Sequence, residues 1–297
     1  MTTNRRILPL PLDEMDPGQR KLAKLGADTV IQVLARNPEL MEASSGLGAY
    51  LLSQGRLQPR IRELMILRVA LRAEAPYEWA NHVPAALGAG ATADEINALS
   101  APEARWAPED EAPLRAADEL CAGAFVTDET WAALAANHDD AEILEILFLV
   151  GYYRMMAGVL NSAGIEPKPG QPELGRPVEA AAQVETVGTE RPSSGRTGPD
   201  GKWEVTFAHP AGSKLILLDL KASGDSLTGS MWDTQLGVGV AIATGTINGD
   251  RIDFTAEMTD PMRFDLVVTA LIEGDTFTGS ITISGGGTFP FSGVRAD

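Results

Sequence analysis

The fold of the N-terminal half is decided by the stretch RELMILRVALRAEAPYEWANHVPAALGAGATADEI, residues 62–96. Its apolar side chains recur at three- and four-residue spacing, as in the run from Leu64 to Leu71. That spacing gathers them along one side of a helix. Thr92 followed by Glu95 has the pattern of a capping box, which begins a further helix. The stretch therefore predicts packed helices.

Helical spacing continues on both sides of this stretch, up to about residue 166. Asn37 before Pro38 and Asp139 before a long apolar run have the residue types that start helices. Residues 167–198 lose this periodicity and fill with Pro, Gly, Ser and Glu. That composition is typical of a linker. We therefore predict an all-α domain over residues 1–166, followed by a linker over 167–198.

From Trp203 onward the pattern changes to short runs rich in β-branched and aromatic residues. Turn dipeptides recur every 25 residues at Gly224-Asp225, Gly249-Asp250 and Gly274-Asp275, the first and third within the near-copies LKASGDSLTGS and LIEGDTFTGS. Each repeat predicts one hairpin. Sequential hairpins favour an antiparallel up-and-down β-barrel over residues 199–297, because closure removes exposed strand edges. In architecture alone it resembles a small lipocalin-like barrel.

Composition is consistent with this α+β chain of two segregated domains. The 297 residues are 44% hydrophobic and 22% charged, which is ordinary for a globular protein. A net charge of −17 makes nucleic-acid binding improbable, because a phosphate backbone requires a concentrated basic surface. One cysteine, Cys121, allows no intrachain disulfide. No signal-peptide core and no apolar run of membrane-spanning length is recognised, so we expect a cytoplasmic protein without membrane contact.

A succession of separate elements in the helical half resembles one known family. The elements are NPEL at residue 37, RIRE at residue 60, YEWANH at residue 77, a Gly-containing turn before Glu95-Ile96, and YYR at residue 152. In this order they are similar to the carboxymuconolactone decarboxylase family, a redox-inactive branch of the alkyl-hydroperoxidase D-like superfamily. The resemblance covers about residues 20 to 166. It implies a helical domain that forms homo-oligomers and acts on a small-molecule substrate.

Peroxidase members of that superfamily carry a Glu, a Cys twelve residues later, a second Cys three after that, and a His four further on. Applied from Glu63, this spacing falls on Ala75, Glu78 and His82. The Glu and the His are present, but neither cysteine is. Since thiol peroxidase chemistry requires a thiolate and a resolving thiol, and Cys121 is distant in sequence, we expect no such activity.

The remaining trio predicts acid–base chemistry. Glu78 and His82 are four residues apart, on one helical face. Two carboxylates beside an imidazole can shift one another's pKa values so that one group donates and another accepts near neutral pH. With the resemblance, we expect His82, Glu63 and Glu78 to be catalytic, without a cofactor or a metal. Candidate substrate-binding residues are Tyr77, Trp79, Arg62, Tyr153 and Asn161.

Simpler interpretations of the same residues remain open. A Glu-x-x-x-His pair is often an exposed helical pair. Glu63 can instead be the buried ion-pair partner of Arg60 or Arg62. The trio has the ligand types for a metal but lacks a second histidine. Trp79 fits a core position as well as a binding surface.

Two hypotheses of different classes follow. The first is a cofactor-independent lyase or isomerase, decarboxylase-like, acting on a small cyclic or carbonyl-containing molecule. A plain decarboxylase of the small carboxylated lactone is one version, although the added barrel suggests a bulkier substrate. The second is a non-catalytic ligand-binding or assembly protein whose apolar site lies in the β-barrel. A peroxidase working through Cys121 is a third, which we do not expect.

Overall fold

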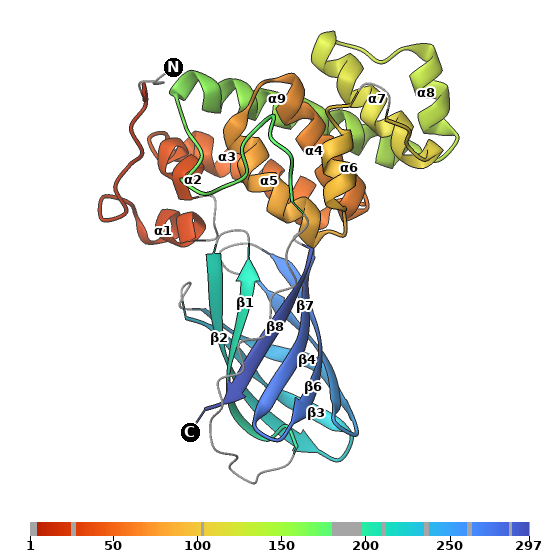
Figure 1. The fold of residues 1–297 in the computed structure, drawn as a ribbon. Helices are drawn as coiled ribbons and strands as arrows, with labels where there is room; N and C mark the ends of the chain where they lie inside the picture. The colour runs from red at the N-terminus through yellow and green to blue at the C-terminus, as the bar shows by residue number, and fades with distance from the viewer. Residues whose placement is uncertain are drawn as a thin grey trace. The chain divides into compact units, whose positions relative to one another are not determined.

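A computed structural model describes residues 5–24, 28–101, 104–179, 198–209, 212–234, 238–259, 263–284 and 287–296. The chain separates into two compact units, residues 1–15 with 29–181 and residues 16–28 with 182–297. The first holds a helical core and the second a strand core. The prediction of an α+β chain with segregated helical and barrel parts is confirmed (Figure 1).

The helices fall where the spacing predicts them. They are α1 (Pro17–Lys24), α2 (Asp28–Leu34), α3 (Pro38–Ala49), the π-helix η1 (Tyr50–Gln54), α4 (Pro59–Arg72), α5 (Pro76–Gly88), α6 (Ala93–Ala98), α7 (Pro108–Ala122), α8 (Asp128–Ala135) and α9 (Asp140–Ala163). Asn37 caps α3, and capping boxes begin α6 at Thr92 and α9 at Asp139. The three start signals recognised in the sequence are therefore confirmed.

Helix α4 lies at the centre of the helical unit. All ten residues from Ile61 to Ala70 are buried, and the helix packs against α5, α7 and α9. A helix buried on every side is a core helix rather than an amphipathic surface helix. Its charged residues must therefore find partners inside the protein, because water is not available to them.

Helix α9 corrects one expectation. It is long and apolar enough to cross a membrane by length and composition alone, although we expected no such run. Half of the 18-residue window is buried within the protein, and core helices of soluble proteins pass the same test. Tyr153, Met156 and Leu160 on its inner side are among the buried residues. The helix is therefore accounted for by packing in the helical unit.

Part of the predicted linker is described, and it lies on the helical unit. Val178 donates its N–H to Asn97 Oδ1 at 2.7 Å and accepts from Asn97 Nδ2 at 3.0 Å. Leu174 and Val178 pack on the helical core, and Gln171 bonds to Asn81. Residues 180–197 of that linker lie outside the described residues, so the domain boundaries stay a prediction.

The second unit contains a closed antiparallel barrel in which each strand pairs with the next and β1 pairs with β8. The strands are β1 (Gly201–His209), β2 (Gly212–Ser223), β3 (Ser226–Asp233), β4 (Val238–Asn248), β5 (Arg251–Met258), β6 (Phe264–Glu273), β7 (Thr276–Ile283) and β8 (Gly287–Arg295). This is the up-and-down order predicted from the sequential hairpins. Closure leaves no unpaired strand edge.

The 25-residue repeat sets the tight turns at one end of the barrel. Gly224, Gly249 and Gly274 each adopt φ near +60°, which glycine reaches without steric cost. The aspartate that follows each glycine accepts a backbone hydrogen bond from a later strand: Asp225 from Ile247, Asp250 from Ile272 and Asp275 from Arg295, at 2.8 to 2.9 Å. The repeat therefore links successive hairpins as well as turning each one.

The same end of the barrel is closed by Trp203 and Arg295. The Arg295 guanidinium lies 4.2 Å from the centre of the fully buried Trp203 ring, and Nε donates to Asp275 at 2.9 Å. Trp203 Nε1 donates to the Pro199 carbonyl at 2.9 Å. A desolvated cation on an indole face adds to the stability of the closed end.

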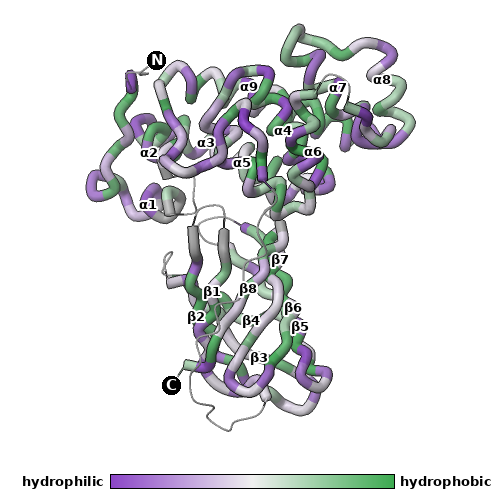
Figure 2. Tube along the Cα trace, viewed as in Figure 1, coloured by the Kyte–Doolittle hydropathy of each residue, from purple (hydrophilic) through white to green (hydrophobic). Residues whose placement is uncertain are grey.

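Side chains fill the barrel interior. Inward residues of successive strands form one apolar cluster that includes Trp203, Phe254 and Phe277, while the turns at one end are hydrophilic (Figure 2). The space left between Phe207, Met231 and their apolar neighbours is a cavity of about 10 Å³. That is about the room of one water, whereas small-molecule pockets are roughly 300–1,000 Å³. The interior formed by the described strands therefore has no room for a sizeable apolar ligand.

Close strand packing gives the first testable prediction. A Cβ at Gly279 would lie 2.1 Å from the Thr269 carbonyl oxygen and 2.7 Å from the Ala270 Cα. Gly279→Ala should therefore destabilise the barrel by about 2–3 kcal/mol, since backbone cannot move aside as a side chain can. Urea unfolding with hydrogen exchange of β6 and β7 peptides measures the effect. Thr278→Ala, an exposed neighbour, should change stability by less than about 0.5 kcal/mol, and an equal effect of both variants would contradict the steric explanation.

Candidate functional site

The candidate site begins at the buried carboxylate of Glu63 on α4. Arg62 Nε and Nη2 donate to Glu63 Oε1 at 3.1 and 2.9 Å, and His82 Nδ1 lies 2.7 Å from Glu63 Oε2. An ionised carboxylate only accepts hydrogen bonds, so Nδ1 carries the proton of this contact. The ring's Nε2 is then the atom that can exchange a proton with a substrate. The His82 side chain is 16% exposed, so its ring is not wholly enclosed.

Electrostatics keep Glu63 ionised. Burial alone would raise the pKa of its carboxyl group, but the attraction of His82 and Arg62 and their hydrogen bonds outweigh burial. The net effect lowers the pKa of Glu63 below its ordinary value. Glu63 therefore holds a negative charge behind His82, and its hydrogen bond fixes the orientation of the ring.

The surroundings of Glu78 shift the pKa of its carboxyl group in the opposite direction. It is 3% exposed, and neither carboxyl oxygen has a hydrogen-bond partner among the described residues. Burial raises the pKa of Glu78 to about 8. At neutral pH most of this carboxyl group is therefore protonated and can donate a hydrogen bond. Buried polar groups without a partner are uncommon and indicate a strained or functional position.

Tyr153 of α9 lies against the His82 ring. Its ring meets His82 edge-on with centroids 5.0 Å apart, and it is 5% exposed. Burial raises the pKa of Tyr153 well above its usual value, and Glu63 and Glu78 add to that shift. The phenol therefore remains protonated, and it lies within electrostatic range of both acids. Contacts thus join four of the candidates, Arg62, Glu63, His82 and Tyr153, while Glu78 lies one helical turn before His82 on α5.

Sequence reasoning did not select Tyr152. Adjacent residues of a helix point in different directions, so Tyr152 and Tyr153 are not expected to face the same site. Tyr152 nevertheless lies 5.4 Å from the Tyr153 ring and donates its hydroxyl hydrogen to the Ser44 carbonyl at 3.2 Å. Burial and Glu78 raise the pKa of Tyr152. In the sequence only the aromatic side chain of Tyr152 pointed to a role in the site. Its contact with Ser44 forms only when the helices pack together.

The other binding candidates lie elsewhere or are already engaged. Tyr77 packs in a separate small cluster with Leu160. Trp79 is a core residue whose Nε1 has no partner among the described residues. Asn161 Nδ2 donates to the carbonyls of residues 73 and 74, which ties α9 to the end of α4. Arg62 is bonded to Glu63. Of these four, only Arg62 is thus shown in contact with the trio.

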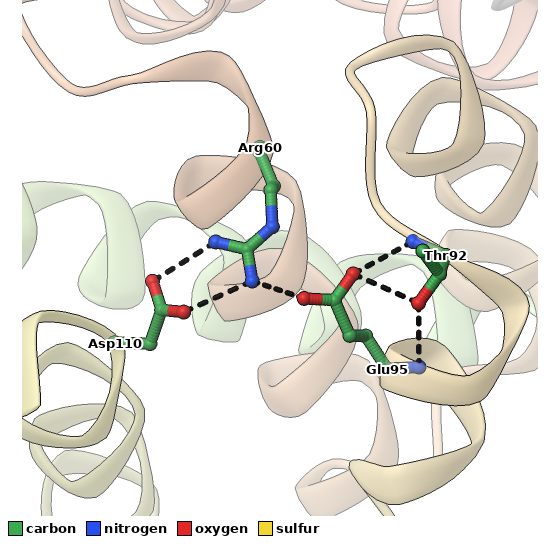
Figure 3. Close-up of polar contacts among 4 residues, drawn as sticks. All are labelled: Arg60, Thr92, Glu95 and Asp110. Carbon is green, nitrogen blue, oxygen red and sulfur yellow. Dashed lines mark hydrogen bonds and ion pairs between the residues drawn. The ribbon is translucent and has the colours of Figure 1, made fainter. Parts of the chain in front are cut away.

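The remaining arginines of α4 join helices to one another. Arg60 makes a two-point contact with Asp110, at 3.1 and 2.9 Å, and also pairs with Glu95 (Figure 3). Arg72 Nε lies 2.7 Å from Asp118, and Arg68 Nε lies 3.6 Å from the same carboxylate. Glu63 therefore pairs with Arg62 and not with Arg60, which answers the alternative left open by the sequence.

The described residues contain no group of three or more His, Cys, Asp or Glu side chains able to hold a metal. Cys121 lies on α7, half-buried, and burial raises the pKa of its thiol, to which Glu78 contributes. It is within electrostatic range of Glu78, although its surroundings disfavour the thiolate.

A known protein family matches part of the helical half of the chain. Residues 38–119 match the carboxymuconolactone decarboxylase family, a segment that contains Glu63, Glu78 and His82 but not Tyr153 or Asn161. No curated protein matches the chain. The helical region of this protein is thus carboxymuconolactone decarboxylase-like, as its sequence predicts.

Solved structures resemble the same half of the chain. A peroxidase-related protein with an alkylhydroperoxidase core from Ralstonia eutropha JMP134 is 19% identical, covering 55% of this chain and 92% of its own, with a TM-score of 0.48. A peroxidase-related protein from Silicibacter sp. TM1040 is 17% identical, covering 56% and 93%, with a TM-score of 0.49. The debrominase Bmp8, in complex with 2,3,4-tribromopyrrole, is 15% identical, covering 57% and 95%, with a TM-score of 0.49.

Replacing Glu63 tests the buried ion pair. Glu63→Gln should lower the free energy of unfolding by about 3–5 kcal/mol at pH 7, because it leaves Arg62 buried without its counter-charge. A depressed pKa contributes stability above the unfolded value near 4.5, and that stability is lost as pH falls through the folded value. The difference between wild type and variant should therefore narrow below about pH 4.5. Urea denaturation from pH 3.5 to 8 measures it, and a constant difference would contradict the pairing.

Glu78→Gln should change the free energy of unfolding in the opposite direction and stabilise the protein. With a folded pKa of about 8 and an unfolded value of 4.5, the native state holds a proton that the unfolded state has released. Wild-type stability therefore declines from pH 4.5 to 8, and the variant should gain about 4 kcal/mol at pH 8 but little at pH 4.5. The same denaturation series measures this. A variant less stable than wild type at pH 8 would mean that Glu78 is ionised and paired.

Proposed function

We propose that the protein is a cofactor-independent lyase or isomerase that acts by acid–base catalysis on a small carbonyl-containing molecule. The observation that carries the proposal is the pair of carboxyl groups in opposite protonation states around one histidine. Glu63 is bonded to His82, whereas Glu78 is buried one helical turn before His82 with no hydrogen-bond partner in the described part of the chain. Environments that drive two acids apart in pKa are characteristic of assigned acid and base roles.

The geometry supports a division of labour. Glu63 holds the Nδ1 hydrogen of His82 and leaves Nε2 as the base. Nε2 removes a proton from the carbon beside the substrate carbonyl, and the electron pair moves onto the carbonyl oxygen. Protonated Glu78 donates a hydrogen bond to that developing enolate. Return of the proton from His82 to another carbon completes an isomerisation, so no electron donor or acceptor is required.

The arginines around α4 favour an uncharged substrate. Arg60, Arg62 and Arg72 are each bonded to a carboxylate of the protein. A substrate carboxylate would have to displace one of these partners, at the cost of leaving a buried or half-buried acid unpaired. Neutral lactones and enones meet no such obstacle. We therefore favour proton-transfer isomerisation or elimination on a neutral carbonyl compound over decarboxylation of a dicarboxylate.

A thiol peroxidase is the competing enzyme class. Ala75 and Glu78 stand at the two positions where the peroxidase spacing places cysteines, and burial disfavours the thiolate of Cys121. We propose that peroxide reduction is not the main activity. Peroxide consumption by wild type and Cys121→Ser discriminates the two classes, because an activity lost only in Cys121→Ser would establish thiol chemistry.

The non-catalytic alternative places an apolar ligand in the barrel. Its support is weaker, since the interior cavity is about 10 Å³. A small-molecule substrate and a cytoplasmic location, without nucleic-acid or membrane partners, complete the proposal. The net charge of −17 favours this, because anionic polymers and anionic lipid surfaces repel such a protein.

Turnover is the direct test. A panel of small lactones, cyclic enones and β-keto acids should include a neutral compound that wild type converts, followed by absorbance and by carbon dioxide release. His82→Ala should lose about 100- to 10,000-fold in rate while remaining folded, because it removes the proton-transfer group. Glu78→Leu should lose about 100- to 1,000-fold, because it removes the hydrogen-bond donor to the enolate. The Glu78 pKa of about 8 also predicts that the rate falls as pH rises through that value.

His138→Ala is the matched control. That histidine lies 3.6 Å from Glu142 at the start of α9, and its loss should leave the rate unchanged. If no compound is converted, or if His82→Ala keeps the wild-type rate, the catalytic proposal is wrong. Glu63 and His82 would then be structural partners of Arg62 only.

A further inference from the structure

Two charged side chains are buried inside the barrel, at the end opposite the tight turns. Lys214 is 6% exposed and Asp233 is 8% exposed. Lys214 continues the inward alternation of Ile216 along β2. Asp233 continues that of Met231 along β3. With Arg295, they are the charged side chains buried among the described residues of the strands. Arg295 closes the other end of the barrel, so the buried pair at this end requires its own explanation.

The two charged side chains influence each other. In the pairing of β2 with β3, Asp233 lies opposite Ile216, one inward position from Lys214, which is within reach of a long side chain. Burial lowers the pKa of Lys214, and the negative charge of Asp233 offsets this only in part. A lysine in such surroundings holds more of the neutral, nucleophilic amine than an exposed lysine does. The neighbouring carboxyl group can take up and return a proton.

The internal repeat shows that packing does not require these charges. Hairpins β2–β3 and β6–β7 are separated by two periods of the 25-residue repeat and pair in the same register. The residues equivalent to Lys214 and Asp233 are Phe264 and Ile283, and both pack on the apolar cluster of the barrel. An apolar pair is often as stable as a buried ion pair, or more so. The charged pair is therefore better explained by chemistry than by stability.

The cavity of the barrel begins beside the charged pair. Its lining includes Phe207, which pairs with Lys214 across β1 and β2, and Ile216, which pairs with Asp233. The other lining residues are apolar as well. The cavity volume of about 10 Å³ admits a group of about the size of one water. A molecule that reaches the charged pair must therefore have a narrow apolar end.

We propose that the Lys214 amine forms a Schiff base with a small unbranched aldehyde, and that Asp233 transfers the protons of this reaction. Asp233 takes a proton from the Lys214 ammonium group, and the freed lone pair bonds to the carbonyl carbon. The carbonyl oxygen takes the proton back from Asp233. Asp233 then moves a proton from the nitrogen to the new hydroxyl group, which leaves as water while the C=N bond forms. Ammonium and aldehyde thus give iminium and water, without oxidation or reduction.

Charge and size favour an aldehyde over other ligands. An anionic ligand is repelled by Asp233 and a cationic ligand by Lys214, so a neutral molecule is favoured. A ketone carries two carbon chains at the reacting carbon, whereas an aldehyde carries one, and the cavity has room for one narrow group. This site belongs to the barrel and does not depend on the proposed chemistry of His82.

Reductive trapping on the full chain tests the proposal. Propanal with sodium cyanoborohydride at pH 7 converts the iminium to a stable propylated lysine, which peptide mass spectrometry locates. Lys214 should be modified at least about 10-fold faster than Lys202 and Lys221, which are exposed on β1 and β2. Asp233→Asn should slow the modification of Lys214 at least about 10-fold, because proton transfer is lost. Loss of the Asp233 charge alone would leave more neutral amine and act in the other direction.

Two controls separate this site from general lysine reactivity. The branched 2,2-dimethylpropanal should show no preference for Lys214, because its chain is too wide for the cavity. The double variant Lys214→Phe with Asp233→Ile copies residues 264 and 283, so it should fold and melt at the wild-type temperature or above. Equal rates at Lys214 and Lys221, an Asp233→Asn variant that reacts as fast as wild type, an undiminished preference with the branched aldehyde, or a double variant that does not fold would each overturn the proposal.

Discussion

The burial of charge in α4 is the constraint on which the helical unit depends. Arg62, Glu63 and Arg68 lie within ten consecutive buried residues, so each must be satisfied by a neighbouring helix or by one another. Leaving one such charge unpaired costs about 3–5 kcal/mol, a large part of the stability of an ordinary domain. The positions of α5, α7 and α9 around α4 are therefore tied to particular side chains as well as to apolar packing.

The same constraint decides what the site can do. The ion pairs of Arg60, Arg68 and Arg72 join α4 to α6 and α7, whereas Glu63 is paired with Arg62 and His82. A histidine held by a buried carboxylate has a defined tautomer, and its second nitrogen points away from that partner. The helical packing thus orients the His82 ring without any help from a bound molecule, which is the arrangement that the proposed proton transfer requires. This is why a scaffold can change its chemistry by changing few residues around one such pair.

Much of this architecture could be read from local sequence signals. The capping boxes at Thr92 and Asp139, the change in periodicity at Trp203 and the 25-residue Gly-Asp repeat are short-range patterns, and each is present in the structure. Long-range partners could not be read in this way. Nothing near Trp203 in sequence indicates Arg295, which comes into contact only when the barrel closes. The sequence likewise left either Arg60 or Arg62 as the ion-pair partner of Glu63, and only the packing of the helices distinguishes the two.

Glu78 shows most clearly why packing has to be known before function is argued. In the sequence it is one of several carboxylates on a helix, and its charge state is not specified. Its two unpartnered oxygens and its raised pKa arise because α5 turns it into an apolar interior. A glutamine of nearly the same shape would be more stable there at neutral pH. A residue that weakens the fold at this position is best explained by chemistry that requires an acid, beside a histidine already held for proton transfer.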